Sequence, residues 1–179
     1  MNVFLIDVRD ENFYRLLPEE LGGSKSGEVR AKVMGFPPLG IETLAPVLRQ
    51  HGHQVRMFDT CHPQMKAEHI AQAVQDDSPD VIGLSFLSIT PYPAVKRLAQ
   101  RLKCVAPATP IIAGGVFASM NPDRILRDCP HLDCVGVGEG EELLPAYLDH
   151  LDDPGAVGGL VWRQGGTIVR NVPRPLIRD

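Results

Sequence analysis

The chain has 179 residues, a formal net charge of -4 and 44% hydrophobic residues. This length is enough for one domain with its own hydrophobic core, and the composition is that of a globular protein. The basic residues are scattered along an acidic chain, which argues against the clustered basic face of a nucleic-acid-binding protein.

Neither the cysteines nor the N-terminus points to a secreted or membrane protein. Cys61, Cys104, Cys129 and Cys134 form no C-x-x-C pair and no zinc-type cluster with histidine, so we expect reduced, mostly buried thiols. The N-terminal MNVFLID lacks the basic and long apolar regions of a signal peptide. No apolar run is long enough to span a membrane. We therefore expect a cytoplasmic protein.

Predicted strands and helices alternate along most of the chain. Residues 2–7 form a continuous apolar run, typical of a strand covered on both faces. Residues 8–38 are irregular, and loops of this length in compact domains are usually functional or mobile. Then follow, in order, a helix ending at Gly52, a strand over 54–59, a helix over 66–75, a strand over 81–85, a helix over 92–105, a strand over 110–113, a short helix beginning near Pro122 with Asn121 as N-cap, a strand over 133–137 and a helix over 139–151.

The C-terminal part has a different pattern. GGLVWRQGGTIVRN, over residues 158–171, predicts a hairpin that turns at Gly165 and Gly166. NVPRPLIRD is proline-rich and suits an extended linker. We therefore expect an α/β domain over residues 1–156, an appended β-hairpin over 157–170 and a linker over 171–179.

Alternating strands and helices predict an α/β fold with a parallel sheet. Right-handed crossovers leave few strand orders, and we expect the flavodoxin-like (Rossmann-like) order 2-1-3-4-5 with the C-terminal hairpin added. In this order the topological switch point lies between the first and third strands, where ligands bind outside the carboxyl ends. The hydroxyl-rich segment SFLSIT follows the third strand at this edge, and Gly114-Gly115 follows the next one.

Several common ligands do not suit these loops. DVRDENF, after the first strand, carries acidic residues that would repel a flavin or nucleotide phosphate. GVGEGEE is a weak dinucleotide fingerprint and follows the wrong strand, and Ser85 stands where a phospho-receiver domain would have its aspartate. A flat, mostly uncharged heteroaromatic group fits better, with Ser85 and the glycines lowering the floor and Leu87 as an apolar wall. The alternative is that Ser85 simply ends a strand and Gly114-Gly115 forms a tight turn.

The order of these motifs resembles the cobalamin-binding domain at the N-terminus of B12-dependent radical SAM enzymes. Ser85-Phe86-Leu87 matches the family's Ser-x-Leu, and Gly114-Gly115 its Gly-Gly. PPLGIETLAPVLRQHGHQV, GVGEGEE and GGLVWRQGGTIVRNVPRP match further marks of the radical SAM branch, so the resemblance covers essentially the whole chain. It implies cobalamin as cofactor, in the methylcobalamin or hydroxocobalamin form. The residues implied in binding are Asp7, Arg9, Pro38, Gly40, Ser85, Leu87, Ser88, Gly114, Gly115, Val116, Gly138, Glu139 and Gly140.

One motif departs from the family pattern. Where the family at large has Asp-x-His-x-x-Gly, this chain reads DVRDEN, with Arg9 in place of the histidine that ligates cobalt from below. A guanidinium has no lone pair to offer a metal. The resemblance therefore implies base-off, His-off binding, with the benzimidazole tail in the Ser-x-Leu slot. His62 is the one histidine expected near this edge, and we interpret it as a loop residue.

The chain lacks the C-x-x-x-C-x-x-C motif that holds the [4Fe–4S] cluster of radical SAM enzymes. The resemblance thus implies that the cluster and S-adenosylmethionine belong to a downstream radical SAM domain, the partner of this one, and that this chain alone is not an enzyme. We expect the cofactor domain of a B12-dependent radical SAM methyltransferase. The alternatives are a free-standing cobalamin carrier and a degenerate interaction module that no longer binds cobalamin.

Overall fold

In a computed structural model, which describes residues 1–10, 37–61, 65–175 and 177, the described strands form a single sheet in the order β2-β1-β3-β4-β5-β6-β7. The strands are β1 (Asn2–Asp7), β2 (Gln54–Asp59), β3 (Val81–Ser85), β4 (Ile111–Gly114), β5 (Cys134–Gly136), β6 (Leu160–Gln164) and β7 (Thr167–Arg170). The strands β1 to β5 pair in parallel, and β6 and β7 extend the sheet in antiparallel fashion. The predicted α/β fold and its strand order are confirmed.

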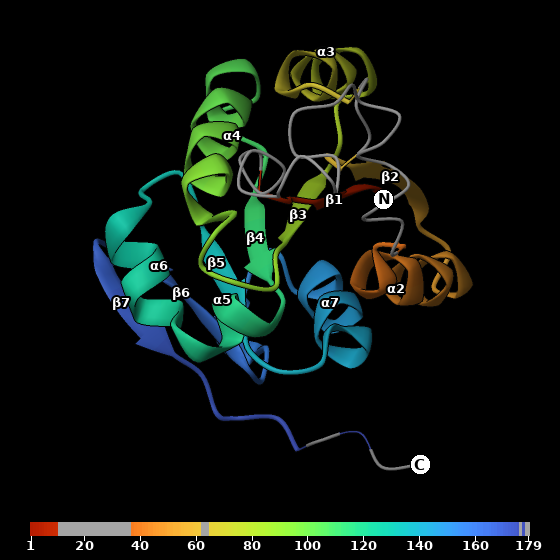
Figure 1. Cartoon of the computed structure of the whole chain (residues 1–179). Coiled ribbons are helices and arrows are strands. Elements are labelled where there is room, and N and C mark those ends of the chain that lie inside the picture. Colours follow the sequence, from red (N-terminus) through yellow and green to blue (C-terminus); the bar gives the residue numbers. More distant parts are fainter. Residues whose placement is uncertain (11–36, 62–64, 176, 178–179) are drawn as a thin grey trace, which may run out of the picture.

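Helices cover both faces of the sheet (Figure 1). They are α2 (Leu39–Gln50), α3 (Ala67–Asp77), α4 (Tyr92–Val105), α5 (Val116–Met120), α6 (Pro122–Asp128) and α7 (Gly140–Asp149), with the 3-10 helix η3 (Pro154–Ala156) before the hairpin. The helices α2 and α7 bury one face of the sheet, and α3, α4 and α6 bury the other.

The central strands are apolar throughout because both of their faces are covered. In β1, Phe4 and Ile6 belong to the core beneath α3 and α4, whereas Val3 and Leu5 belong to the core beneath α2 and α7. Successive side chains of a strand point to opposite faces, so this continuous apolar run supplies both cores. The strand is therefore fixed in the middle of the sheet, with its carboxyl end at Asp7.

The observed elements follow the predicted ones to within a few residues, with one exception. Helix α5, over Val116–Met120, was not predicted, since five residues after a glycine pair give too short a pattern to read. Asn121 does precede α6, but its side chain donates to the carbonyl of Phe117 in α5 (3.1 Å) and does not cap α6. A short helix therefore replaces the expected turn after β4.

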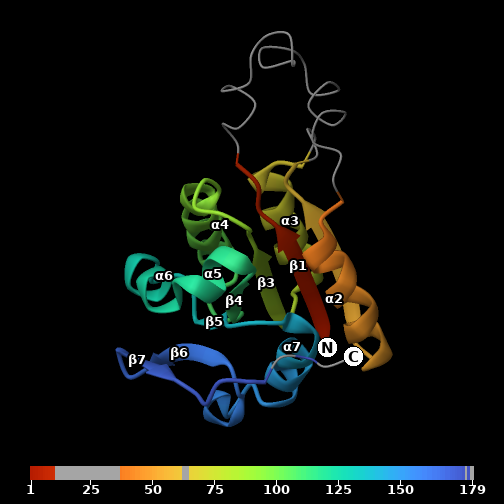
Figure 2. The same ribbon diagram turned by 60° about the horizontal axis from the view of Figure 1, so that its bottom comes forward.

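The C-terminal hairpin is continuous with the sheet. Trp162 of β6 is aligned with Cys134 of β5, and the hairpin turns at Gly165 and Gly166, whose φ angles of 54° and 87° match the left-handed residues of a tight hairpin turn. Figure 2 shows the hairpin at the edge of the sheet and the C-terminal segment passing alongside α7.

No disulfide joins the described cysteines, and their exposures differ. Cys129 and Cys134 are buried, as expected, but Cys104 is exposed because it lies on the outer face of α4. Within the described part of the chain, none of the helices combines the length and the hydropathy needed to cross a membrane.

Candidate functional site

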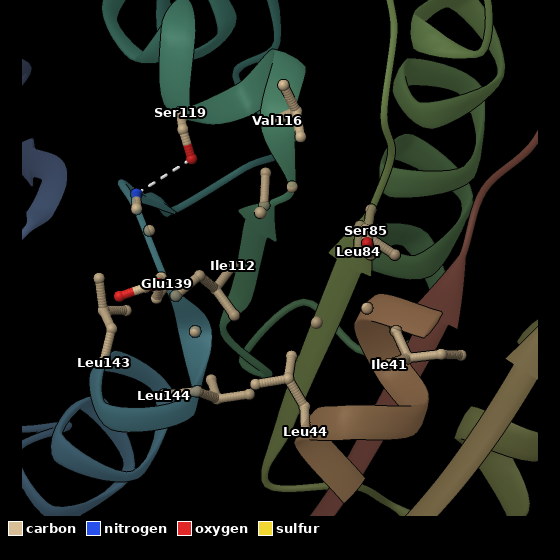
Figure 3. A pocket seen from close by; sticks show the side chains of 18 of the residues that line it. Ile41, Leu44, Leu84, Ser85, Ile112, Val116, Ser119, Glu139, Leu143 and Leu144 are labelled. Carbon is tan, nitrogen blue, oxygen red and sulfur yellow. Dashed lines mark hydrogen bonds between the residues drawn. The ribbon is translucent and has the colours of Figure 1, made fainter. Parts of the chain in front are cut away.

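A cavity of about 450 Å³ lies at the carboxyl edge of the sheet, on the face covered by α2 and α7 (Figure 3). This volume is within the usual range for small-molecule sites. Its floor is formed by β3, β4 and β5, its walls by α2 and α7, and its upper rim by α5. The site therefore lies where the strand order predicted a ligand.

Small residues make the floor of this cavity hollow. The sheet register aligns Ser85 with Gly114 and Gly83 with Ile112, so these positions face the same side. A Cβ atom added to Gly114 would meet nothing within 4 Å, whereas one added to Gly83 would lie 3.0 Å from Leu5 Cδ2. A side chain at Gly83 would require Leu5 to shift inside the sheet, whereas Gly114 leaves open space in the cavity.

The walls are apolar and closely set. Ile41 and Leu44 of α2 line the cavity on one side, and Leu143 and Leu144 of α7 line it on the other. The two helices approach each other closely at Gly140, where a Cβ atom would lie 2.9 Å from Leu44 Cδ2. A side chain at Gly140 would have to displace the tip of Leu44, so the glycine favours the close approach of the two helices independently of any ligand.

Few polar side chains face the cavity. Ser85 is half-buried and lines the cavity among apolar side chains, and none of the hydrogen bonds seen between described residues involves its hydroxyl. The Ser119 hydroxyl, in contrast, accepts a hydrogen bond from the backbone N–H of Gly138 (3.1 Å), which joins α5 to the β5–α7 loop. Ser85 is thus a hydroxyl that is available to a ligand in a mostly apolar slot.

Gly115 has a different role from its neighbour Gly114. Its φ angle is +96°, and a Cβ atom at this position would lie 2.5 Å from the carbonyl oxygen of Phe86. Any side chain would therefore clash with the backbone that follows β3. Gly115 lets the chain turn from β4 into α5 close beside the Ser-x-Leu segment.

Most of the predicted binding residues line this cavity. They are Gly40, Ser85, Leu87, Gly114, Gly115, Val116, Gly138, Glu139 and Gly140. Of the others, Pro38 is the N-cap residue of α2, and its carbonyl accepts hydrogen bonds from the N–H groups of Ile41 and Glu42. Ser88 is exposed and lies 2.9 Å from the Thr90 hydroxyl. The structure thus brings the three separate motifs together and leaves these two residues outside.

Asp7 and Arg9 form an ion pair outside the cavity. Arg9 Nε donates to Asp7 Oδ2 (2.5 Å) and lies 3.7 Å from Asp59 Oδ1. Burial raises the pKa of Asp7 even though the hydrogen bond and charge of Arg9 act in the opposite direction. Arg9 also lines a second cavity of about 410 Å³, together with Thr60 and residues of α3 and α4. The remainder of DVRDEN, Glu11 and Asn12, lies outside the described residues.

None of the histidines in the described ranges lines the main cavity. His51 and His53 lie at the amino edge of the sheet, where His53 is 3.5 Å from the N-terminal amine. His62 lies outside the described residues. No group of three or more His, Cys, Asp or Glu side chains among the described residues could hold a metal ion.

Sequence reasoning missed several lining residues. Ile41, Leu44, Leu143 and Leu144 occupy apolar helix positions that look the same in the sequence as core positions. Ser119 belongs to the unpredicted α5. The sequence gave no clear signal for it, because the segment is too short to show a helical period.

Comparisons with known proteins agree with this geometry. A family model described as "B12 binding domain" matches residues 32–148. An "uncharacterized methyltransferase" of Pyrococcus horikoshii is 28% identical over 146 residues, which covers 80% of this chain and 31% of that protein. The anaerobic magnesium-protoporphyrin IX monomethyl ester cyclase of Synechocystis is 30% identical over 148 residues, covering 80% of this chain and 30% of the cyclase.

A second named methyltransferase and a solved structure are also similar to this chain. The cytidylyl-2-hydroxyethylphosphonate methyltransferase of Streptomyces wedmorensis is 28% identical over 161 residues, covering 78% of this chain and 30% of that enzyme. The fold matches the cobalamin-dependent S-adenosylmethionine radical enzyme OxsB, solved with aqua-cobalamin and S-adenosylmethionine bound, with a TM-score of 0.72 at 20% identity over 98% of this chain and 22% of OxsB. The chain thus spans about three tenths of the length of these curated relatives. Because the family model covers more than half of the sequence, the chain belongs to the B12-binding domain family.

Proposed function

We propose that this chain binds cobalamin base-off and His-off, with the benzimidazole tail in the cavity between α2 and α7. The observation that carries the proposal is the open floor at Gly114 beside the hydroxyl of Ser85, which has no partner among the described residues. The Ser85 hydroxyl would donate to a ring nitrogen of the base, and the apolar walls would cover its faces.

The residues around the mouth of the cavity also fit a large cofactor. Leu87, Val116 and Met120 are 69%, 57% and 76% exposed, which is unusual for apolar side chains that stand so close together at one edge of a sheet. A cavity of about 450 Å³ would hold the tail but not the corrin ring as well. These exposed side chains would therefore contact the macrocycle outside the cavity, along with the backbone of Gly138 and Glu139.

The His-off state follows from the residue at position 9. The Arg9 guanidinium offers no lone pair, and it is already bonded to Asp7. Asp7 and Arg9 would then remain an ion pair and would not serve as ligands of cobalt. When bound, cobalamin supplies a carrier for a methyl group, and this chain would hold and orient that carrier.

The greater length of the relatives supports a role as one domain of a larger enzyme. We propose a cofactor domain over residues 1–156, extended by the hairpin over 157–170 and joined by 171–179 to a radical SAM domain. That partner domain would hold the [4Fe–4S] cluster and S-adenosylmethionine. Two of the three relatives described above are named methyltransferases, so we propose methyl transfer as the reaction of the whole enzyme.

A second candidate function rests on the altered loop after β1. Because DVRDEN departs from the family motif, the chain could instead be an interaction module that keeps the fold without the cofactor. Binding decides between the two. The chain would be incubated with hydroxocobalamin and freed of unbound cofactor on a desalting column, and its absorbance spectrum would then be recorded.

Both outcomes of this experiment are informative. Co-elution with a base-off spectrum supports the proposal, and the reduced cob(II)alamin form should lack nitrogen superhyperfine splitting in its electron paramagnetic resonance spectrum. Co-elution with a histidine-ligated spectrum would contradict the His-off state alone. Protein that elutes free of corrin would favour the interaction module.

A further inference from the structure

The C-terminal segment is tied to the body of the domain at its beginning. We call residues 171–175 and 177 the C-terminal strap. The Asn171 side-chain amide donates to the carbonyls of Pro154 (2.6 Å) and Val157 (2.8 Å), and its oxygen accepts from Trp162 Nε1 (3.1 Å). The N–H of Gly159 donates to the Val172 carbonyl (2.8 Å). The start of the strap is therefore held by several hydrogen bonds to buried and half-buried neighbours.

The middle of the strap lies against α7 (Figure 2). Arg174 Nη2 donates to Glu142 Oε2 (2.7 Å). Its aliphatic stem covers Gly158 and Gly159, where an added Cβ atom would lie 3.2 Å from Arg174 Cγ in each case. The ion pair is partly exposed, with side chains 26% and 54% exposed, so it contributes little by itself.

The end of the strap meets the loop that borders the main cavity. The backbone N–H of Ile177 donates to Glu139 Oε2 (2.6 Å). Glu139 is the N-cap residue of α7, yet its side chain makes no capping hydrogen bond. Its carboxylate is turned to the strap while the residue lines the main cavity, and a small cavity of about 20 Å³ beside the strap is lined by Glu139 as well. One residue therefore touches both the strap and the candidate site.

The β5–α7 loop is fixed from three sides. The N–H of Val137 donates to the Gly159 carbonyl (2.9 Å), and that of Gly138 donates to Ser119 Oγ (3.1 Å). The strap holds the third residue of the loop, Glu139. Gly138 has a φ angle of +95°, a conformation that glycine adopts readily and that allows the loop other arrangements. Release of Glu139 would therefore free the part of the loop that forms the rim of the cavity.

We infer that the C-terminal strap positions Glu139 and thereby couples its own docking to ligand affinity in the main cavity. This inference deepens the proposed function and rests on it. The strap is held firmly at Asn171 but at its far end mainly by the Ile177–Glu139 hydrogen bond, so it would detach from that end first. Coupling is reciprocal: a ligand that orders the loop also favours the docked strap. Any domain that follows the strap would sense the cofactor through this contact.

Two matched substitutions in the strap test the contact in the whole chain. Ile177→Pro removes the N–H that donates to Glu139, whereas Ile177→Ala removes only an apolar side chain that is 40% exposed. On the other side, Glu139→Ala removes the acceptor. Glu139→Gln keeps an acceptor but removes its charge. This variant should lie between the wild type and Glu139→Ala, because hydrogen bonds to neutral acceptors are weaker than those to carboxylates.

Two readouts separate this inference from the proposed function. Hydrogen exchange of residues 137–140 reports loop order without any ligand, and equilibrium titration with hydroxocobalamin reports affinity. In Ile177→Pro and Glu139→Ala we expect faster exchange of the loop and about fivefold weaker cobalamin binding, at the lower end of usual couplings between sites. Ile177→Ala should behave as the wild type in both measurements.

Each contrary result has a distinct meaning. Unchanged exchange in Ile177→Pro would overturn the positioning role of the strap. Faster exchange with unchanged affinity would overturn the coupling. A wild-type chain that retains no cobalamin would overturn the proposed function, and the coupling to ligand affinity would fall with it.

Discussion

The two adjacent glycines at the end of β4 offer a sharp test, because the structure gives them different roles. At Gly114 a Cβ atom would meet nothing within 4 Å, and its φ angle is not in the left-handed region. We therefore choose Gly114→Leu, which places an apolar side chain on the floor of the cavity beside Ser85. The substitution fills the space that the benzimidazole tail would occupy under the proposed function, without disturbing the packed sheet.

Stability and binding should move in opposite directions in this variant. Replacing glycine where the new residue fits stabilises a protein by about 0.4–1 kcal/mol, because the unfolded chain loses freedom. A ligand forced against the added side chain meets an overpacked site, and overpacking costs about 1–3 kcal/mol, or about 5- to 150-fold in dissociation constant. A general loss of folding cannot produce this combination.

The assay is a hydroxocobalamin titration followed by absorbance, paired with urea denaturation of the same preparation. Ala108→Leu is the matched control, since Ala108 is exposed in the turn between α4 and β4, at the opposite edge of the sheet. The control should bind as the wild type does. Wild-type affinity in a correctly folded Gly114→Leu chain would refute the assignment of the tail to this cavity.

Three further substitutions test the turn after β4, the hydroxyl in the cavity and the buried carboxylate of β1. Gly115→Ala should lower the unfolding free energy measured in urea by about 1–3 kcal/mol, because alanine is strained in a left-handed backbone conformation. The clash with the Phe86 carbonyl should lower it further. A variant with the unfolding free energy of the wild type would contradict this. Ser85→Ala should weaken cobalamin binding by about two- to twelvefold, the value of one hydrogen bond, with little change in stability; unchanged affinity would show that the hydroxyl is not used. Burial raises the pKa of Asp7 above its ordinary value of 3.8. Between these two pKa values the folded state keeps a proton that the unfolded state has released. The unfolding free energy should therefore fall as pH rises from 3.8 through the pKa of the folded state. In urea titrations across this range the Asp7→Asn variant should gain stability relative to the wild type, and parallel curves would contradict the shift.

The parallel sheet could be predicted because its strands are buried on both faces. A continuous apolar run such as residues 2–7 would leave apolar side chains in water if one face of the strand were exposed. Because such strands alternate with amphipathic helices, few sheet topologies are possible. The short helix α5 could not be predicted in the same way, since five residues complete little more than one turn and show no clear period. Tertiary contacts with β4, β5 and α6, and not local propensity, hold it in place.

The floor and rim of the candidate site were predictable for a geometric reason. The carboxyl ends of parallel strands meet at one edge, so residues that end different strands, such as Ser85 and Gly114, must come together. The walls carried no such signal: the apolar residues of α2 and α7 that line the cavity follow the same helical pattern as those that fill the core. The path of the chain after β1 could not be predicted either. Nothing in the sequence indicated that Arg9 would pair with Asp7 and line a cavity with residues of α3 and α4.

The separation between Arg9 and the cavity bears on the proposed His-off binding of cobalamin. The slot is built from the ends of β3 and β4 and from α2 and α7, and Arg9 is not among the described residues that line it. The link between the two regions is backbone: the N–H of Val8 donates to the Ser85 carbonyl (2.8 Å), and Asp7 is aligned with Ser85 in the sheet. A change of side chain at position 9 leaves these bonds intact. If the tail binds as proposed, we therefore expect the slot and the side chain at position 9 to vary independently. A histidine at position 9 should then alter the spectrum of bound cobalamin far more than its affinity.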